Sequence, residues 1–134
     1  MTISDLVKKI NNFKWWRLFK RVEDYTMVGH EKLYSLCEIV SYLEINKVPG
    51  SFVECGVWKG GAAAVMADVS RRMHGRRKIW LFDSFKGLPK PSIADGLPAQ
   101  LQYDKDKGVS SISTVKYLLF DMLKIDSSLV EIIP

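Results

Sequence analysis

The sequence predicts an α/β domain in which three parallel strands are flanked by helices, with further helices ahead of the first strand. Two short apolar runs, residues 52–57 and 78–83, have the length and composition of buried parallel strands. A helical pattern separates them, and a third apolar run at residues 129–133 follows another helical pattern. Strands that alternate with helices favour one parallel sheet with right-handed crossovers.

Composition limits the classes of protein to consider. The 134 residues are 47% hydrophobic with a net charge of +5, which suits one folded domain and excludes a disordered chain. The sequence has no apolar run long enough to span a bilayer and no secretory signal, so we expect a cytoplasmic location without membrane insertion. Basic clusters at residues 8–21 and 71–78 suit either nucleic-acid contact or solvated helix surfaces. We favour the second and expect no nucleic-acid partner.

Residues 1–47 are expected to form an N-terminal helical region, with the α/β domain covering residues 48–134. Thr2 and Asp5 have the spacing of a capping box for a first amphipathic helix. The aromatic segment 15–19 continues it and is predicted to pack within the domain or against another subunit; a membrane-surface helix is the alternative. The first helix is marked by Ile3, Leu6, Val7, Ile10 and Phe13, and a second by Leu33, Leu36, Cys37, Val40 and Leu43.

Further along the chain, residues 62–73 have helical spacing, and Gly75 is predicted to close that helix. Residues 112–123 form the last predicted helix. Between them, residues 84–109 are rich in glycine and proline and predict a long loop of the kind that often forms a lid or binding loop. Cys37 and Cys55 are both predicted to be small buried hydrophobic residues without a disulfide.

The turn after the first strand is the most informative stretch for function. Glu54, Gly56, Gly60 and Gly61 give the spacing E-x-G-x-x-x-G-G, and the following helix directs free N–H groups at a ligand. A dinucleotide fingerprint reads G-x-G-x-x-G, but here Trp58 stands where the second glycine would admit a pyrophosphate. The acidic Glu54 suits a cationic ligand. S-adenosyl-L-methionine has an ammonium and a sulfonium and no phosphate.

Asp83 ends the second predicted strand, 27 residues after Gly56. An acidic residue at this place in a nucleotide-binding fold bonds ribose hydroxyls, so Asp83 is predicted to bind the ribose of an adenosyl group. Phe85 follows closely and is predicted to pack on adenine.

Two longer motifs carry a resemblance to a known family. Residues 48–61, VPGSFVECGVWKGG, and residues 81–89, LFDSFKGLP, closely resemble the macrocin O-methyltransferase (TylF-like) family. The similarity covers roughly residues 22–134. It implies a Rossmann-like class I methyltransferase that uses S-adenosyl-L-methionine, with Mg²⁺ beside it, to methylate a hydroxyl of a sugar or other small natural product.

The resemblance also implies which residues line the cofactor. It provides no catalytic residue and no metal ligand within this chain, and Asp104 and Asp106 are expected to be solvated in the lid. The implied cofactor-binding residues are Thr26, Met27, Glu54, Gly56, Val57, Trp58, Gly60, Gly61, Ala62, Asp83, Ser84 and Phe85.

A methyltransferase of this class has seven strands, of which this sequence supplies three, so we expect a partial domain that stops before the acceptor-binding half. The first strand should then have an open edge, which favours pairing with another copy in a homo-oligomer. Two alternatives stay open. The chain could be a non-catalytic fragment that binds the cofactor, or another nucleotide-binding Rossmann protein such as a dehydrogenase.

Overall fold

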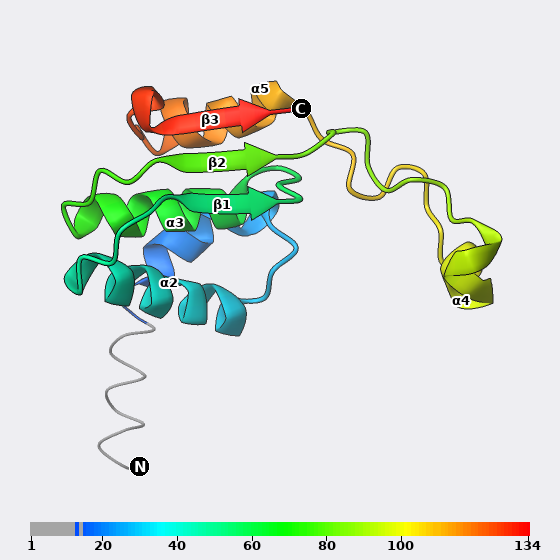
Figure 1. The fold of residues 1–134 in the computed structure, drawn as a ribbon, viewed down its shortest axis with the longest axis horizontal. Helices are drawn as coiled ribbons and strands as arrows, with labels where there is room; N and C mark the ends of the chain where they lie inside the picture. Colours follow the sequence, from blue (N-terminus) through cyan, green and yellow to red (C-terminus); the bar gives the residue numbers. More distant parts are fainter. Residues whose placement is uncertain (1–12, 14) are drawn as a thin grey trace, which may run out of the picture.

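A three-stranded parallel sheet forms one side of the molecule (Figure 1). The computed structural model describes residue 13 and residues 15–134. Strands β1 (Phe52–Cys55), β2 (Ile79–Phe82) and β3 (Val130–Ile133) lie in the order β1-β2-β3. Phe52 pairs with Ile79, and Ile79 pairs with Val130. The predicted α/β fold with three parallel strands is therefore confirmed.

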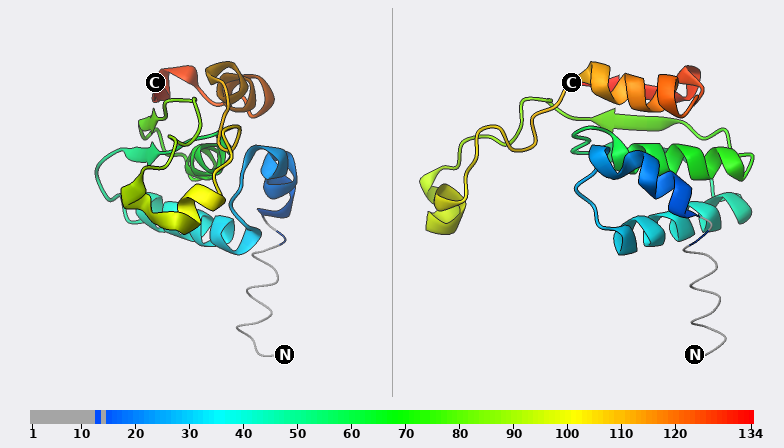
Figure 2. Two further views of the ribbon diagram at one scale, coloured as in Figure 1. Left: turned by 90° about the vertical axis from the view of Figure 1, so that its right-hand side faces the viewer. Right: turned by 180° about the vertical axis from the view of Figure 1, so that it is seen from behind.

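The helices form layers on one side of this sheet (Figure 2). Helix α3 (Gly61–Arg72) lies against the strands and is buried along most of its length, because α2 (His30–Ile45) packs on its other side. Helix α5 (Ile112–Lys116) continues into a π-helical segment, η3 (Tyr117–Met122), so the predicted helix over 112–123 exists but changes its winding halfway. Two short 3₁₀ turns complete the body: η1 (Glu23–Tyr25) and η4 (Ser127–Leu129).

The other face of the sheet is uncovered within the described residues, and this corrects one prediction. Cys55 is exposed rather than buried, and Val53, Phe82 and Ile133 on the same face are each more than one-third exposed. An apolar run in a parallel strand predicts cover on both faces, but the described helices lie on one. Cys37, by contrast, is buried as predicted.

The aromatic N-terminal segment packs within the domain, as predicted. Residues 15–22 are helical, and Trp15, Leu18, Phe19 and Val22 all join the core formed by the sheet and its helices. Of the three aromatic residues of segment 15–19, only Trp16 faces outward, 46% exposed. The predicted capping box and the first four apolar positions of the first helix lie outside the described residues. In the part of the chain that the structure describes, no helix is long and apolar enough to cross a membrane.

The end of α3 differs from the prediction in one residue. His74, rather than Gly75, takes the left-handed conformation, with φ at 60°. Gly75 is needed for a different reason, because a Cβ there would lie 2.5 Å from Ser70 Oγ and 2.7 Å from Glu44 Oε1. Glu44 accepts hydrogen bonds from Ser70 and Arg77, so the glycine lets the chain pass close to a polar contact between α2 and α3.

The predicted loop over 84–109 forms an arm that extends away from the body beyond the carboxyl ends of the strands (Figure 1). It carries a short 3₁₀ turn, η2 (Ile93–Asp95), followed by α4 (Gly96–Leu101). Its two legs meet in a single antiparallel bridge between Lys86 and Val109. We call the paired residues 86–88 and 107–110 the neck of the arm.

Candidate cofactor site

The turn between β1 and α3 is shaped by three residues with positive φ. Gly56 and Gly60 have φ values of 87° and 90°, where glycine avoids the strain that a side chain would cause. Trp58 lies between them with φ at 50°, an uncommon conformation for a bulky residue. The backbone at residue 58 has a φ value that favours glycine, but the residue is a tryptophan. Other contacts must therefore stabilise this conformation of Trp58.

Asp83 supplies the main contact. Its Oδ2 accepts hydrogen bonds from the backbone N–H groups of Val57 at 2.7 Å and Trp58 at 2.8 Å, and its Oδ1 accepts from Phe85 at 2.7 Å. Burial acts to raise the pKa of Asp83, but these three N–H donors outweigh it and hold the pKa below its usual value. The carboxylate thus fixes the turns after both β1 and β2. Its predicted contact with a ribose stays a prediction.

Glu54 faces the beginning of α3. The backbone N–H of Ala63 donates to its carboxylate, while Oε2 is buried and has no hydrogen-bond partner. Burial raises the pKa of Glu54 to about 7, the Ala63 N–H opposes the shift, and the negative charge of Asp83 adds to it. A buried carboxylate oxygen without a partner is costly, so the site is incomplete without a donor or a cation.

The segment before α2 closes this site from the other side. A Cβ on Gly61 would lie 2.6 Å from both Thr26 Cβ and the carbonyl oxygen of Tyr25, so only glycine permits this approach. The result is a pocket of about 90 Å³ that contains eight of the twelve predicted cofactor residues. It is lined by Tyr25, Thr26, Met27, Val28, Glu54, Gly56, Val57, Trp58, Gly61 and Ala62.

The remaining four predicted residues lie around this pocket. Gly60 packs against Val115 of α5, and Asp83 holds the turn as described. Ser84 is exposed and its Oγ accepts a hydrogen bond from the N–H of Lys86. Phe85 is only 8% exposed and belongs to the hydrophobic core. The packing of Phe85 on adenine stays a prediction.

Two contacts of Trp58 were missed by the sequence reasoning. Its Nε1–H donates to the carbonyl oxygen of Val109 at 3.2 Å, and Lys59 Nζ lies 4.7 Å from the centre of its ring. Val109 is 51 residues away along the chain and contributes a backbone oxygen, so no side-chain pattern could reveal it. The place of Lys59 directly after an aromatic residue was the one available signal for the second contact.

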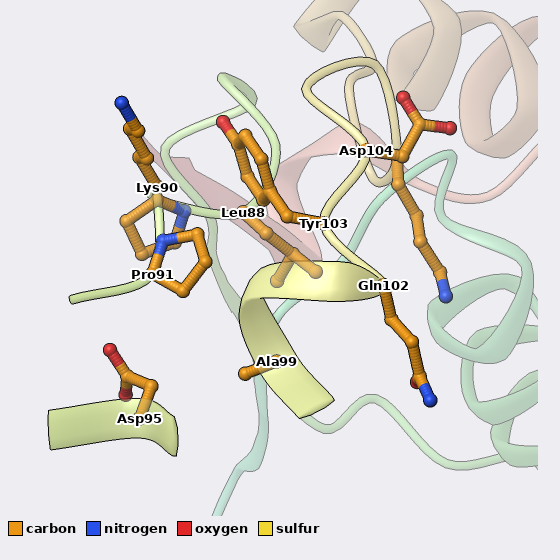
Figure 3. A pocket seen from close by; sticks show the side chains of 10 residues that line it. Leu88, Lys90, Pro91, Asp95, Ala99, Gln102, Tyr103 and Asp104 are labelled. Carbon is orange, nitrogen blue, oxygen red and sulfur yellow. The ribbon is translucent and has the colours of Figure 1, made fainter. Parts of the chain in front are cut away.

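Among the described residues, no group of three or more His, Cys, Asp or Glu side chains could hold a metal, so the residues present do not fit Mg²⁺. The arm encloses a hollow of about 340 Å³ between its two legs and α4 (Figure 3). Lys90 and Pro91 line it from one leg, Tyr103 and Asp104 from the other. Its lining has no buried polar atom that lacks a partner.

The fold and the glycine turn define a Rossmann-like class I methyltransferase domain, and comparison with a solved structure agrees. The chain matches the O-methyltransferase NovP with a TM-score of 0.69 and 30% identity, over 82% of this chain and 47% of that one. The family model "Macrocin-O-methyltransferase (TylF)" matches residues 17–130. The chain therefore belongs to the macrocin O-methyltransferase family, and the resemblance seen in its sequence is confirmed.

Three curated relatives are similar over about half of the chain. Demethyldecarbamoylnovobiocin O-methyltransferase of Streptomyces niveus is 41% identical over 66 residues, which are 48% of this chain and 25% of the relative. An 8-demethyl-8-(2,3-dimethoxy-alpha-L-rhamnosyl)-tetracenomycin-C 4'-O-methyltransferase of Streptomyces olivaceus is 43% identical over 68 residues, 49% of this chain and 26% of that one. Mycinamicin III 3''-O-methyltransferase of Micromonospora griseorubida is 38% identical over 74 residues, 51% and 29% of the two chains. The matches thus span between a quarter and a third of these relatives.

Proposed function

We propose that this chain binds S-adenosyl-L-methionine and serves methyl transfer to a hydroxyl of a sugar or other small natural product. The observation that carries the proposal is the unpartnered, buried Oε2 of Glu54 in a pocket at the start of α3. An ammonium group placed in that pocket would satisfy the oxygen and offset the cost of burying the carboxylate.

The lining of the pocket supports this cofactor over a dinucleotide. Glu54 and Asp83 put two carboxylates near the glycine turn, which opposes a pyrophosphate and favours a cation. Trp58 also fills the position where a pyrophosphate would need a bare backbone. A cofactor with a positively charged amino-acid end and an uncharged nucleoside end fits both observations.

When bound, the cofactor supplies a methyl group made electrophilic by its sulfonium. The residues of this chain would bind and orient it. Glu54 would hold the ammonium, the Gly56 turn would let the ligand approach the backbone, and Thr26 and Met27 would limit access from one side. Positioning of this kind is a large part of the rate gain in a direct displacement.

The acceptor and the partners are inferred from the relatives. The three curated relatives are named as O-methyltransferases of novobiocin, tetracenomycin and mycinamicin compounds, which supports a natural-product hydroxyl as the acceptor class. The uncovered sheet face and the outer edge of β1 support a homo-oligomer, since exposed apolar strands favour pairing. We place the reaction in the cytoplasm.

A calorimetric titration with S-adenosylhomocysteine tests the proposal. We expect binding by the wild type and a loss of roughly ten- to a hundredfold in affinity for Glu54→Gln, because that change removes one charge-assisted contact. Glu131→Gln is the matched control, since Glu131 is exposed on the uncovered face of β3 and should leave binding unchanged. No binding by a folded wild type, or tighter binding of NAD, would overturn the proposal.

A further inference from the structure

Trp58 connects two parts of the molecule that the sequence places far apart. Trp58 is one of the residues that line the candidate cofactor pocket, and its Nε1–H donates to the carbonyl oxygen of Val109 in the neck of the arm. One residue therefore belongs both to the lining of the candidate pocket and to the contact at the base of the arm, which extends away from the body beyond the carboxyl ends of the strands (Figure 1).

The neck itself is weakly held. Its backbone hydrogen bonds are long: Leu88 N–H to Lys107 O is 3.3 Å, and Ser110 N–H to Phe85 O is 3.4 Å. Distances beyond about 3.2 Å are longer than most protein hydrogen bonds, so each contributes little. The neck has only one bridge pair, Lys86 with Val109. An additional hydrogen bond from the body to the neck, such as that from Trp58 to Val109, can thus have a large influence on the position of the arm.

The legs of the neck are nevertheless in close contact. A Cβ on Gly87 would lie 2.8 Å from both the carbonyl oxygen of Lys107 and Val109 Cγ2. Because the legs touch at this point, a force on Val109 moves the two legs together. The arm beyond them exposes Ile93, Leu97 and Leu101, the last two on α4 and all more than 60% exposed. The orientation of the neck therefore determines where these apolar side chains lie relative to the body of the protein.

Trp58 is also held rigidly at its own backbone. Its N–H donates to Asp83, its φ is 50°, and Lys59 lies over its ring. A residue held in an uncommon conformation by several contacts has little freedom to adjust on its own. A ligand that contacts the turn must therefore either move the indole or restrict its motion. Both effects change the hydrogen bond from the indole to Val109.

We propose that Trp58 is a positioning residue that couples occupancy of the cofactor pocket to the order and direction of the arm. The identity of the ligand in this proposal rests on the proposed function. The link between Trp58 and the neck rests on the geometry alone. Through the hydrogen bond of the indole N–H to Val109, a change in the conformation of the glycine turn changes the position of the neck. The position of the neck in turn determines where the apolar residues of the arm lie.

Hydrogen–deuterium exchange of the neck amides, with and without S-adenosylhomocysteine, tests this coupling. The variant Trp58→Phe keeps an aromatic ring and removes the N–H donor. Trp80→Phe is the matched control, because Trp80 lies in β2 and outside the described contacts of the neck. In the free protein, we expect Trp58→Phe to speed exchange of peptides covering Leu88 and Ser110 roughly fivefold, the loss of about one hydrogen bond. Peptides of α3 should be unchanged.

With ligand present, the wild type and Trp80→Phe should show slower exchange at the neck, and Trp58→Phe should show no slowing although calorimetry detects binding. Equal neck exchange in the wild type and Trp58→Phe, without ligand or with ligand bound, would overturn the coupling. If the folded wild type binds no S-adenosylhomocysteine, the proposed function fails, while the comparison of the free proteins still decides whether Trp58 holds the neck.

Discussion

The carboxylate of Asp83 at the end of β2 accepts a hydrogen bond from the backbone N–H of Trp58, 25 residues earlier in the chain. This bond joins the two turns at the carboxyl edge of the sheet, and it compensates the uncommon backbone conformation of Trp58. The acidic residue that ends β2 is thus part of the structure of the turn before any ligand binds.

Replacement of Asp83 tests this role. We expect Asp83→Ala to lower the free energy of unfolding by about 1–3 kcal/mol, since three N–H groups lose a charged acceptor. Chemical denaturation measures the change. Asp126→Ala is the control, because the exposed Asp126 caps η4 and pairs with Arg76 at the surface, so its loss should destabilise the fold much less than the loss of Asp83. Equal losses in the two variants would contradict the role of Asp83.

The pKa of Glu54 makes stability depend on pH. Burial raises it to about 7 in the folded state from 4.5, so the folded protein retains a proton that the unfolded chain releases. The group therefore adds most stability below pH 4.5, and that contribution is lost as the pH rises through 7. The full change is on the order of 3 kcal/mol. Denaturation at pH 5 and pH 8 should show this fall in the wild type and not in Glu54→Gln.

The same group makes ligand binding depend on pH. The ammonium group of the ligand needs the ionised form of Glu54, so the affinity for S-adenosylhomocysteine should rise about tenfold between pH 6 and pH 8. Binding near pH 7 should release a fraction of a proton, which calorimetry detects by comparing buffers of different ionisation enthalpy. Glu131→Gln should keep both effects. A flat profile in the wild type would show that Glu54 does not meet the cation.

The contact between Gly61 and the segment before α2 predicts a sharp difference between two glycines. Gly61→Ala places a Cβ 2.6 Å from the carbonyl oxygen of Tyr25, so we expect a loss of about 1–3 kcal/mol in stability. It should also weaken S-adenosylhomocysteine binding, because Thr26 lines the pocket. Gly29→Ala is the control, since a Cβ there meets nothing within 4 Å. Similar effects of the two changes would argue against the close approach.

The uncovered sheet face predicts self-association. Val53 is 58% exposed on the edge strand β1, and Phe82, which pairs with Cys55, is exposed on the same face. We expect concentration-dependent association in light scattering that Val53→Lys reduces, because a charge on an edge strand disfavours pairing. Val48→Lys, placed just before the strand, should leave it unchanged. A wild type that stays monomeric at high concentration would contradict the prediction.

Periodicity and turn residues were sufficient to predict the order of the three strands with their flanking helices and the position of the glycine turn, but not the short helix α4 in the arm. Local patterns cannot distinguish a sheet covered on one face from a sheet covered on both, and the prediction of a buried Cys55 is wrong for that reason. They also could not show that the carboxylate of Asp83 is occupied by backbone donors, or that Phe85 is buried. The bond from Trp58 to Val109 depends on a backbone oxygen, which any residue type could supply.

The exposure of Cys55 has a practical consequence. The sequence holds two cysteines, and Cys37 is buried while Cys55 is exposed at the end of β1, one residue before the glycine turn. A maleimide dye should therefore attach at one defined point on the uncovered face, beside the candidate site. A dye at Cys55 would report on ligand binding and on a second copy approaching the sheet, without any engineered cysteine.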